Sequence, residues 1–226
     1  YDSGSAQYNW LQNDLEDAND NRESVPWIVL FAHRPMYSSN GDGDGHGSEI
    51  EFREAMEILL YDYQVDLAVW GHDHHYERTY PVFEEKVYSN NSGTFLEPYY
   101  KPGATIHIVA GMSGRSAYDG LVEPKPAWSA YREVAYGYTM FEATETSINY
   151  KFIRNSDGAI GDNFWIINAL DPELPIELPN ENNNSKNETN DDNIIEQIKE
   201  LSYISAPSII LIITSTAIIR FKSKKN

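Results

Sequence analysis

The chain has 226 residues, of which 41% are hydrophobic, and a formal net charge of −18 at pH 7. This length is enough for a sizeable hydrophobic core. The acidic balance argues against a nucleic-acid partner, because nucleic-acid binding requires a basic surface. The absence of cysteine excludes disulfide bonds and thiol catalysis.

Two apolar runs separated by an amphipathic segment predict a strand–helix–strand unit. The runs are residues 27–32 and 65–70, and residues 49–63 between them carry apolar side chains at helical spacing. Ser48 and Glu51 have the spacing of a capping box at the start of this helix. A crossover of this length favours parallel, neighbouring strands, which end at the same edge of a sheet. Ligands of open α/β sheets bind at that edge.

Three histidines follow the ends of these two predicted strands. His33 follows the first run, and His72 and His74 follow the second in the sequence Gly-His-Asp-His-His. Side chains two residues apart in an extended segment point the same way. Neutral imidazole is the commonest protein metal ligand. We therefore expect these three side chains to converge on a metal site.

Two further histidines are expected to support the fold. His75 should face away from His74 in an extended segment, and His107 lies inside the apolar strand predicted at residues 104–110. The adjacent charges Glu77 and Arg78 are expected to orient the loop that carries the metal ligands.

The segments after residue 134 change from mixed elements to strands alone. Residues 135–167 contain alternating or apolar runs separated by turn residues at 144–146 and 155–158, which predicts antiparallel hairpins. Residues 170–200 are rich in Asn, Pro and acidic residues, which is typical of a disordered stalk. Sequons predict N-glycosylation of three asparagines: Asn90, Asn183 and Asn187.

The C-terminal residues have the pattern of a membrane anchor. Residues 201–219 contain no charge, and residues 220–226 form a basic tail. Nineteen helical residues rise about 28 Å, close to the hydrocarbon thickness of a bilayer. The basic tail predicts a single-pass protein with a lumenal or extracellular head. A cleaved glycolipid-anchor signal and a buried or surface helix are the alternatives.

Two blocks of the sequence resemble a known family. Residues 27–39 (WIVLFAHRPMYSS) and 71–82 (GHDHHYERTYPV) are similar to the last two signature blocks of purple acid phosphatases, within the calcineurin-like metallophosphoesterases. Residues 7–19 and 128–143 are similar to a helix and to C-terminal strands of that family. The resemblance implies an α/β fold in which residues 1–169 are the C-terminal part of a metallophosphoesterase βαβ sandwich. Leu30 departs from the usual valine.

The resemblance implies a dinuclear metal centre of iron plus a divalent ion (zinc, manganese or iron). His33 and His72 would bind the divalent ion, and His74 the ferric ion. The family draws further ligands from Gly-Asp-x-Gly, Gly-Asp-x-x-Tyr and Gly-Asn-His motifs, none of which occurs in this sequence. The chain is therefore expected to carry the C-terminal half of the catalytic domain and to be poorly active alone.

The implied reaction is the hydrolysis of phosphate monoesters. Two metal ions neutralise the phosphoryl oxygens and lower the pKa of a bound water to make hydroxide. The leaving alkoxide needs a proton. His46, in the glycine-rich loop after His33, lies where the family has substrate-facing histidines and is the candidate catalytic residue. A solvated loop histidine and a calcium loop that includes Asp42 and Asp44 are the alternatives.

Two classes of function remain open. The first is a membrane-anchored acid phosphatase, with a phosphodiesterase of the same superfamily as its variant. The second is a truncated or non-catalytic, membrane-anchored binding module that has kept the fold. The retained histidines favour the first class, and the missing motifs favour the second.

Overall fold

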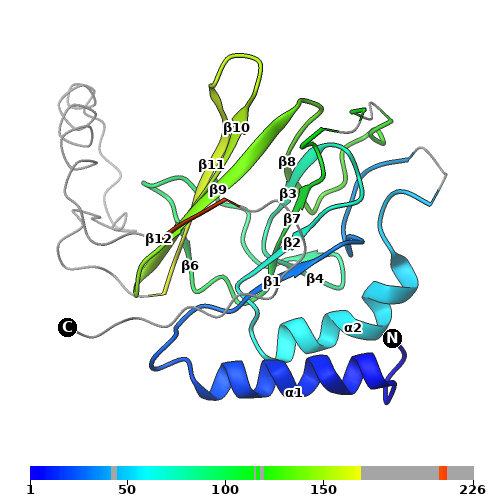
Figure 1. Cartoon of the computed structure of the whole chain (residues 1–226), viewed down its shortest axis with the longest axis vertical. Helices are drawn as coiled ribbons and strands as arrows, with labels where there is room; N and C mark the ends of the chain where they lie inside the picture. The colour runs from blue at the N-terminus through cyan, green and yellow to red at the C-terminus, as the bar shows by residue number, and fades with distance from the viewer. Residues whose placement is uncertain (42–44, 115, 118–119, 169–208, 213–226) are drawn as a thin grey trace, which may run out of the picture.

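The computed structural model describes residues 1–41, 45–114, 116–117 and 120–168, together with a strand at 209–212. Two sheets face each other, and two helices lie side by side on the outer face of the first sheet (Figure 1). The helices are α1 (Ala6–Asp20) and α2 (Ile50–Asp62). The α/β sandwich expected from the sequence is therefore confirmed.

The first sheet contains the predicted strand–helix–strand unit. Its strand order is β1 (Val29–Ala32), β2 (Leu67–Trp70), β7 (Ile106–Ala110), β3 (Tyr76–Thr79) and β8 (Ser129–Glu133). The strands β1 and β2 are parallel neighbours, as expected from the α2 crossover, and β7 runs parallel to β2 on its other side. The strand β3 runs antiparallel to both β7 and β8, which the sequence did not indicate.

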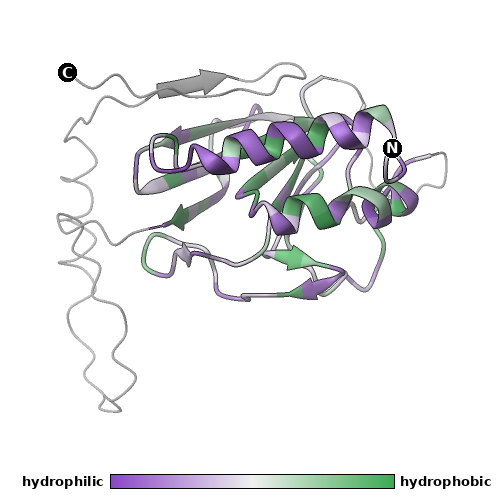
Figure 2. Cartoon of the chain, turned by 90° about the horizontal axis from the view of Figure 1, so that it is seen from below, coloured by the Kyte–Doolittle hydropathy of each residue, from purple (hydrophilic) through white to green (hydrophobic). Residues whose placement is uncertain are grey.

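Both faces of the first sheet are covered, because successive side chains of β1 point to opposite faces and pack against different layers. Leu30 packs with the helix residues Leu15 and Met56 in one buried cluster. Val29 and Phe31 point to the other face and pack in a second cluster with residues of the second sheet. The apolar sides of the helices turn toward the sheet and their polar sides away from it (Figure 2). A strand buried on both faces is expected to be continuously apolar, as residues 27–32 are.

The second sheet has the order β12 (Ile209–Ile212), β9 (Gly137–Ala143), β10 (Ser147–Arg154), β11 (Ile160–Ile167) and β6 (Tyr99–Tyr100). The antiparallel pairing of β9, β10 and β11 confirms the hairpins expected at residues 135–167. A two-stranded sheet of β4 (Val82–Phe83) and β5 (Lys86–Val87) completes the fold.

A buried ion pair joins the two sheets. Arg78 of β3 donates from Nε and Nη2 to Asp162 of β11, at 2.7 and 3.1 Å. The hydroxyl of Tyr76 donates to the same carboxylate at 2.8 Å. Because the donors satisfy both carboxylate oxygens, the buried charges are compensated and fix the register between the sheets.

The helix α2 begins differently from the expected capping box. Its N-cap is Glu49, with no side-chain cap, so the prediction for Ser48 and Glu51 was wrong. The Ser48 hydroxyl instead accepts a hydrogen bond from Ser38 N at 2.9 Å and donates to Ser38 O at 3.1 Å. This reciprocal pair closes the base of the loop between β1 and α2.

The expected stalk (170–200) and basic tail (220–226) lie outside the described residues. Within the expected membrane span, only 209–212 is described, and these residues form β12 antiparallel to β9. Among the described residues, no helix has both the length and the apolar character to cross a bilayer.

His107 is buried in β7, in agreement with the expected structural role. Its Nδ1 accepts a hydrogen bond of 3.1 Å from Trp70 Nε1, and the two rings are stacked. Burial, with a smaller contribution from the Arg53 charge, lowers the pKa of His107 to about 3. The pKa of His107 in the unfolded chain is about 6.5, so the folded chain binds fewer protons than the unfolded chain between the two pKa values. The contribution of neutral His107 to the unfolding free energy is therefore lost progressively as pH falls below about 6.5.

We expect His107 to contribute roughly 1.5 kcal/mol to the loss of unfolding free energy between pH 6.5 and pH 5. His107→Asn keeps an acceptor near Trp70 but does not titrate in this range. Denaturant unfolding of both proteins at several pH values should therefore give a steeper decline for the wild type. Parallel declines would contradict a neutral, buried His107.

Candidate metal and phosphate site

The parallel register of β1 and β2 brings their following residues together. Ala32 is opposite Trp70, and Gly71 N donates to His33 O at 3.0 Å. His72 Nδ1 then lies 3.1 Å from His33 Nε2, with the ring centroids 5.0 Å apart. The structure therefore brings His33 and His72 together, as the sequence predicted from two parallel, neighbouring strands.

The segment after β2 is a turn rather than an extended strand. His72 has a φ of 66°, and Asp73 N donates to Gly71 O at 2.8 Å. The expectation of an extended backbone from His72 to His74 was therefore wrong. The left-handed backbone is costly for a residue with a Cβ, and it directs the imidazole of His72 toward the loop before α2.

His72 and His74 share one feature of metal-binding histidines. His72 Nε2 donates to Gly45 O at 3.0 Å, and His74 Nδ1 donates to Ser116 O at 2.9 Å. A ring N–H bonded to a backbone carbonyl fixes the tautomer and places the lone pair on the other ring nitrogen. That nitrogen is Nδ1 in His72, where it faces His33.

His46 packs among the same imidazoles. Its ring stacks on His72 with centroids 4.7 Å apart, and it lies 6.1 Å from the ring of His74. Its side chain is 15% exposed. His46 is therefore part of the cluster and not a solvated loop histidine. The candidate calcium ligands Asp42 and Asp44 lie outside the described residues.

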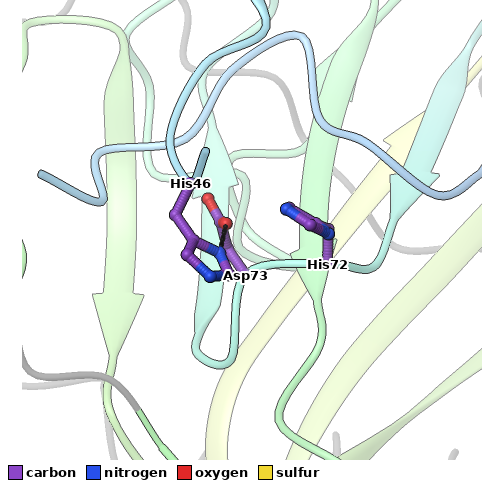
Figure 3. A group of neighbouring side chains, drawn as sticks. All are labelled: His46, His72 and Asp73. Carbon is purple, nitrogen blue, oxygen red and sulfur yellow. Dashed lines mark hydrogen bonds and ion pairs between the residues drawn. The ribbon is translucent and has the colours of Figure 1, made fainter. Parts of the chain in front are cut away.

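Asp73 is the residue that sequence reasoning missed. Its side chain is fully buried, and its carboxylate accepts a hydrogen bond from His46 Nδ1 at 2.8 Å (Figure 3). It also accepts from Gly47 N at 3.0 Å and from the Ser38 hydroxyl. The only signal in the sequence was an acid placed between two candidate ligands. Its partners lie 26 to 35 residues earlier, at distances that local patterns do not encode.

The fold-supporting role expected of His75 and Glu77 agrees with their positions. Both are buried, and His75 Nε2 donates to Glu77 at 3.1 Å. Glu77 also accepts from Ser39 N at 2.7 Å and from Ser129 Oγ at 2.6 Å. Burial raises the pKa of Glu77, but these hydrogen bonds outweigh it and hold the pKa below its usual value. The acid thus fastens the loop after β1 to β8.

The donor set fits metal ions. A separation of 3.1 Å between His33 Nε2 and His72 Nδ1 suits two ligands of one ion with bonds of about 2.1 Å. Burial, the neighbouring His72 and Arg34 lower the pKa of His33, which favours the neutral form that binds metals. Ligand atoms of His46, His72 and Asp73 also lie within 4.8 Å of one another.

The fold is a sandwich of two sheets with an outer helix layer, and imidazoles gather just beyond the carboxyl ends of its parallel strands β1 and β2. This combination is typical of metal-dependent phosphoesterases. The family descriptions "Calcineurin-like phosphoesterase" and "Iron/zinc purple acid phosphatase-like protein C" match residues 1–76 and 104–163. The chain therefore belongs to the purple acid phosphatase family of the calcineurin-like phosphoesterases.

Relatives of known name agree with this family. Acid phosphatase type 7 of Danio rerio is 42% identical over 60% of this chain and 33% of its own length. The Homo sapiens protein of the same name is 37% identical over 73% of this chain and 39% of its own length. A purple acid phosphatase from seeds of yellow lupin (Lupinus luteus) has a TM-score of 0.64 and 28% identity, over 74% of this chain and 29% of that chain.

Two facts limit what family membership implies for activity. The chain spans only 33% and 39% of the lengths of the two acid phosphatases, so their similarity to this chain does not assign their activity to it. "Probable inactive purple acid phosphatase 1" of Arabidopsis thaliana is also 35% identical over 72% of this chain and 26% of its own length.

The predicted glycosylation sites are divided between two parts of the chain. Asn90 is exposed, between β5 and β6, where an attached glycan would meet no buried surface. Asn183 and Asn187 lie outside the described residues.

We expect Gly111→Ala to damage the site. A Cβ at Gly111 would lie 2.0 Å from Asp73 O, so the turn carrying His72 must move. The substitution should cost about 1–3 kcal/mol of unfolding free energy and weaken Zn²⁺ binding by about tenfold or more. Denaturant unfolding and calorimetric Zn²⁺ titration measure the two effects.

Gly71→Ala is the matched control, because a Cβ there makes an ordinary contact of 3.5 Å with His33 Nδ1. It should change both quantities little. Equal Zn²⁺ affinities in the two variants and the wild type would show that the turn does not position a metal ligand.

Proposed function

We propose that this chain supplies the C-terminal half of the active site of an acid phosphatase that hydrolyses phosphate monoesters. The observation that carries the proposal is the convergence of four imidazoles at one sheet edge, those of His33, His46, His72 and His74. Imidazoles gathered in this way are typical of sites that bind metal ions. Metal ions that bind a phosphate ester would be held by such a group of imidazoles.

The proposed ligand roles follow the hydrogen bonds of each ring. His33 and His72 would hold a divalent ion, since their facing nitrogens are 3.1 Å apart. His74 would hold an iron(III) ion, with its Nδ1–H bonded to Ser116 O. Such ions, when bound, neutralise phosphoryl oxygens and activate water as a nucleophile. The hydrogen bonds of His72 and His74 to backbone carbonyls would hold both rings in the orientation that binds the ions.

His46 is the proposed proton donor to the leaving oxygen of the ester. Its ring stacks on His72, so a phosphoryl group near that ligand would lie within reach of His46. An alkoxide is a poor leaving group unless it is protonated as it departs. An imidazole held beside the ligands can give this proton and recover it from water afterwards.

Two alternatives share the same residues. A phosphodiesterase would use the same ions, but its leaving group belongs to a diester. A non-catalytic binding module is favoured by the plant relatives whose names call them inactive. The two acid phosphatases with the highest identity quoted above favour turnover.

The kinetic test uses an extended enzyme, in which the chain is preceded by the N-terminal segment of the human acid phosphatase type 7. Replacing His33, His72 or His74 by Ala should lower bound metal and turnover together. His46→Ala should leave bound metal unchanged and lower kcat by about 10²–10⁴-fold on alkyl phosphates. The loss should be smaller on p-nitrophenyl phosphate, whose leaving group needs little protonation.

Residues 1–226 alone provide the baseline and should turn over poorly, because the sequence lacks the three motifs that carry further ligands. Robust, EDTA-sensitive activity of residues 1–226 would contradict the half-site proposal. Equal losses on both substrates would assign His46 to phosphate binding, and a preference for diesters would favour the phosphodiesterase.

We also propose that residues 201–219 anchor the protein in a membrane, with the catalytic part lumenal or extracellular. The support is the uncharged run of nineteen residues and the basic residues that follow it. The protein should stay with membranes after carbonate washing, whereas a variant ending at residue 200 should not. A tag after Asn226 should be protected in sealed cells.

Release of the full chain by carbonate would contradict the anchor. It would agree instead with the pairing of β12 and β9, in which residues 209–212 extend the second sheet.

A further inference from the structure

Asp73 is a buried acid whose side-chain partners all belong to the loop between β1 and α2. The carboxylate accepts from His46 Nδ1, Gly47 N and the Ser38 hydroxyl. Ser38 and Ser48 also close the base of the loop through their reciprocal hydrogen bonds. The loop is thus fixed at its base and at the residue that carries the proposed proton donor.

The hydrogen bond to His46 decides which ring nitrogen carries the proton. A carboxylate only accepts hydrogen bonds, so the 2.8 Å contact requires the proton of a neutral His46 to lie on Nδ1. Nε2 of the neutral ring then carries the lone pair, so Nε2 is the nitrogen that takes a proton from water and gives it to the leaving oxygen, while Nδ1 keeps its proton and its hydrogen bond to Asp73. The same contact fixes the ring about its side-chain bonds, in the plane that stacks on His72 at an angle of 26°.

We propose that Asp73 is a positioning residue that sets the tautomer and the ring plane of His46. It acts on the reaction through His46 and not by touching the substrate. The proposal concerns the geometry of the chain itself; only its kinetic consequence rests on the proposed phosphatase function.

A direct metal-binding role for Asp73 is the competing assignment, since its oxygens lie within 4.8 Å of ligand atoms of His46 and His72. Three donors already occupy the carboxylate, including a backbone N–H that cannot be replaced without moving the loop. Oδ1 faces His46 Nδ1, and both donors to Oδ2 belong to the loop that carries His46. Three hydrogen bonds to this one loop favour the positioning role.

The first test measures the His46 tautomer by ¹⁵N NMR of the imidazole nitrogens in the metal-free chain, at a pH of about 8 where histidines are neutral. The wild type should show the proton on Nδ1. In Asp73→Asn, an amide that keeps its oxygen toward Gly47 N turns its NH₂ group toward His46. The proton of His46 should then move to Nε2.

Ser38→Ala is the matched control, because it removes one partner of Asp73 and leaves the contact with His46. The His46 proton should remain on Nδ1. A wild-type proton on Nε2 would overturn the proposal, even if Asp73→Asn does not fold. An unchanged tautomer in a folded Asp73→Asn protein, judged by circular dichroism, would overturn it as well.

The second test is a double-mutant cycle in the extended enzyme. Asp73→Asn should lower kcat on alkyl phosphates by about 10²–10⁴-fold, as loss of the proton donor does, with little change in KM or bound metal. In the His46→Ala background it should lower kcat further by less than about threefold, because the two residues act as one unit.

A full additional loss in that background would show that Asp73 acts without His46. Loss of bound metal in Asp73→Asn would assign Asp73 as a ligand. If the extended enzyme has no phosphatase activity but the tautomer still changes, the phosphatase proposal fails and the positioning role stands.

Discussion

The parallel pairing of β1 and β2 is the constraint on which the site depends. The register opposes Ala32 and Trp70, so the chain leaves both strands at the same level of the sheet. His33 and His72 meet there because Gly71 N bonds to His33 O one residue beyond the strands. A shift of one residue along either strand would turn its apolar side chains to the opposite faces. Both faces are buried, so the same packing that stabilises the sheet also sets the spacing of the histidines.

Much of this arrangement could be predicted from the sequence. The helix over residues 50–62, the parallel strands on either side of it and the hairpins of β9 to β11 follow from local periodicity and turn residues. The meeting of His33 and His72 follows from topology alone. Features that depend on contacts distant in sequence could not be derived in this way, including the antiparallel insertion of β3 and the ion pair of Arg78 and Asp162.

The errors at the site have a common physical origin. An extended backbone was assumed after β2, but His72 has a positive φ. The hydroxyl of Ser48 was assigned to a helix cap, but it closes the loop through Ser38. In both places a tertiary hydrogen bond overrides the local preference. Asp73 connects the two places. It directly follows His72 in the sequence, and its carboxylate accepts hydrogen bonds from the loop that Ser48 closes. The resulting cluster combines proposed ligands, a proposed proton donor and the acid that orients it.

The central claim is that the facing nitrogens of His33 and His72 bind one metal ion. The most direct measurement is a Zn²⁺ titration of the chain, followed by the ¹⁵N chemical shifts of all its imidazole nitrogens. Our account predicts that His33 Nε2 and His72 Nδ1 change together at the same Zn²⁺ concentrations. The nitrogens of the buried His75 and His107 should not change. Zn²⁺ binding that leaves His33 and His72 unaffected, or that changes only one of them, would contradict the account.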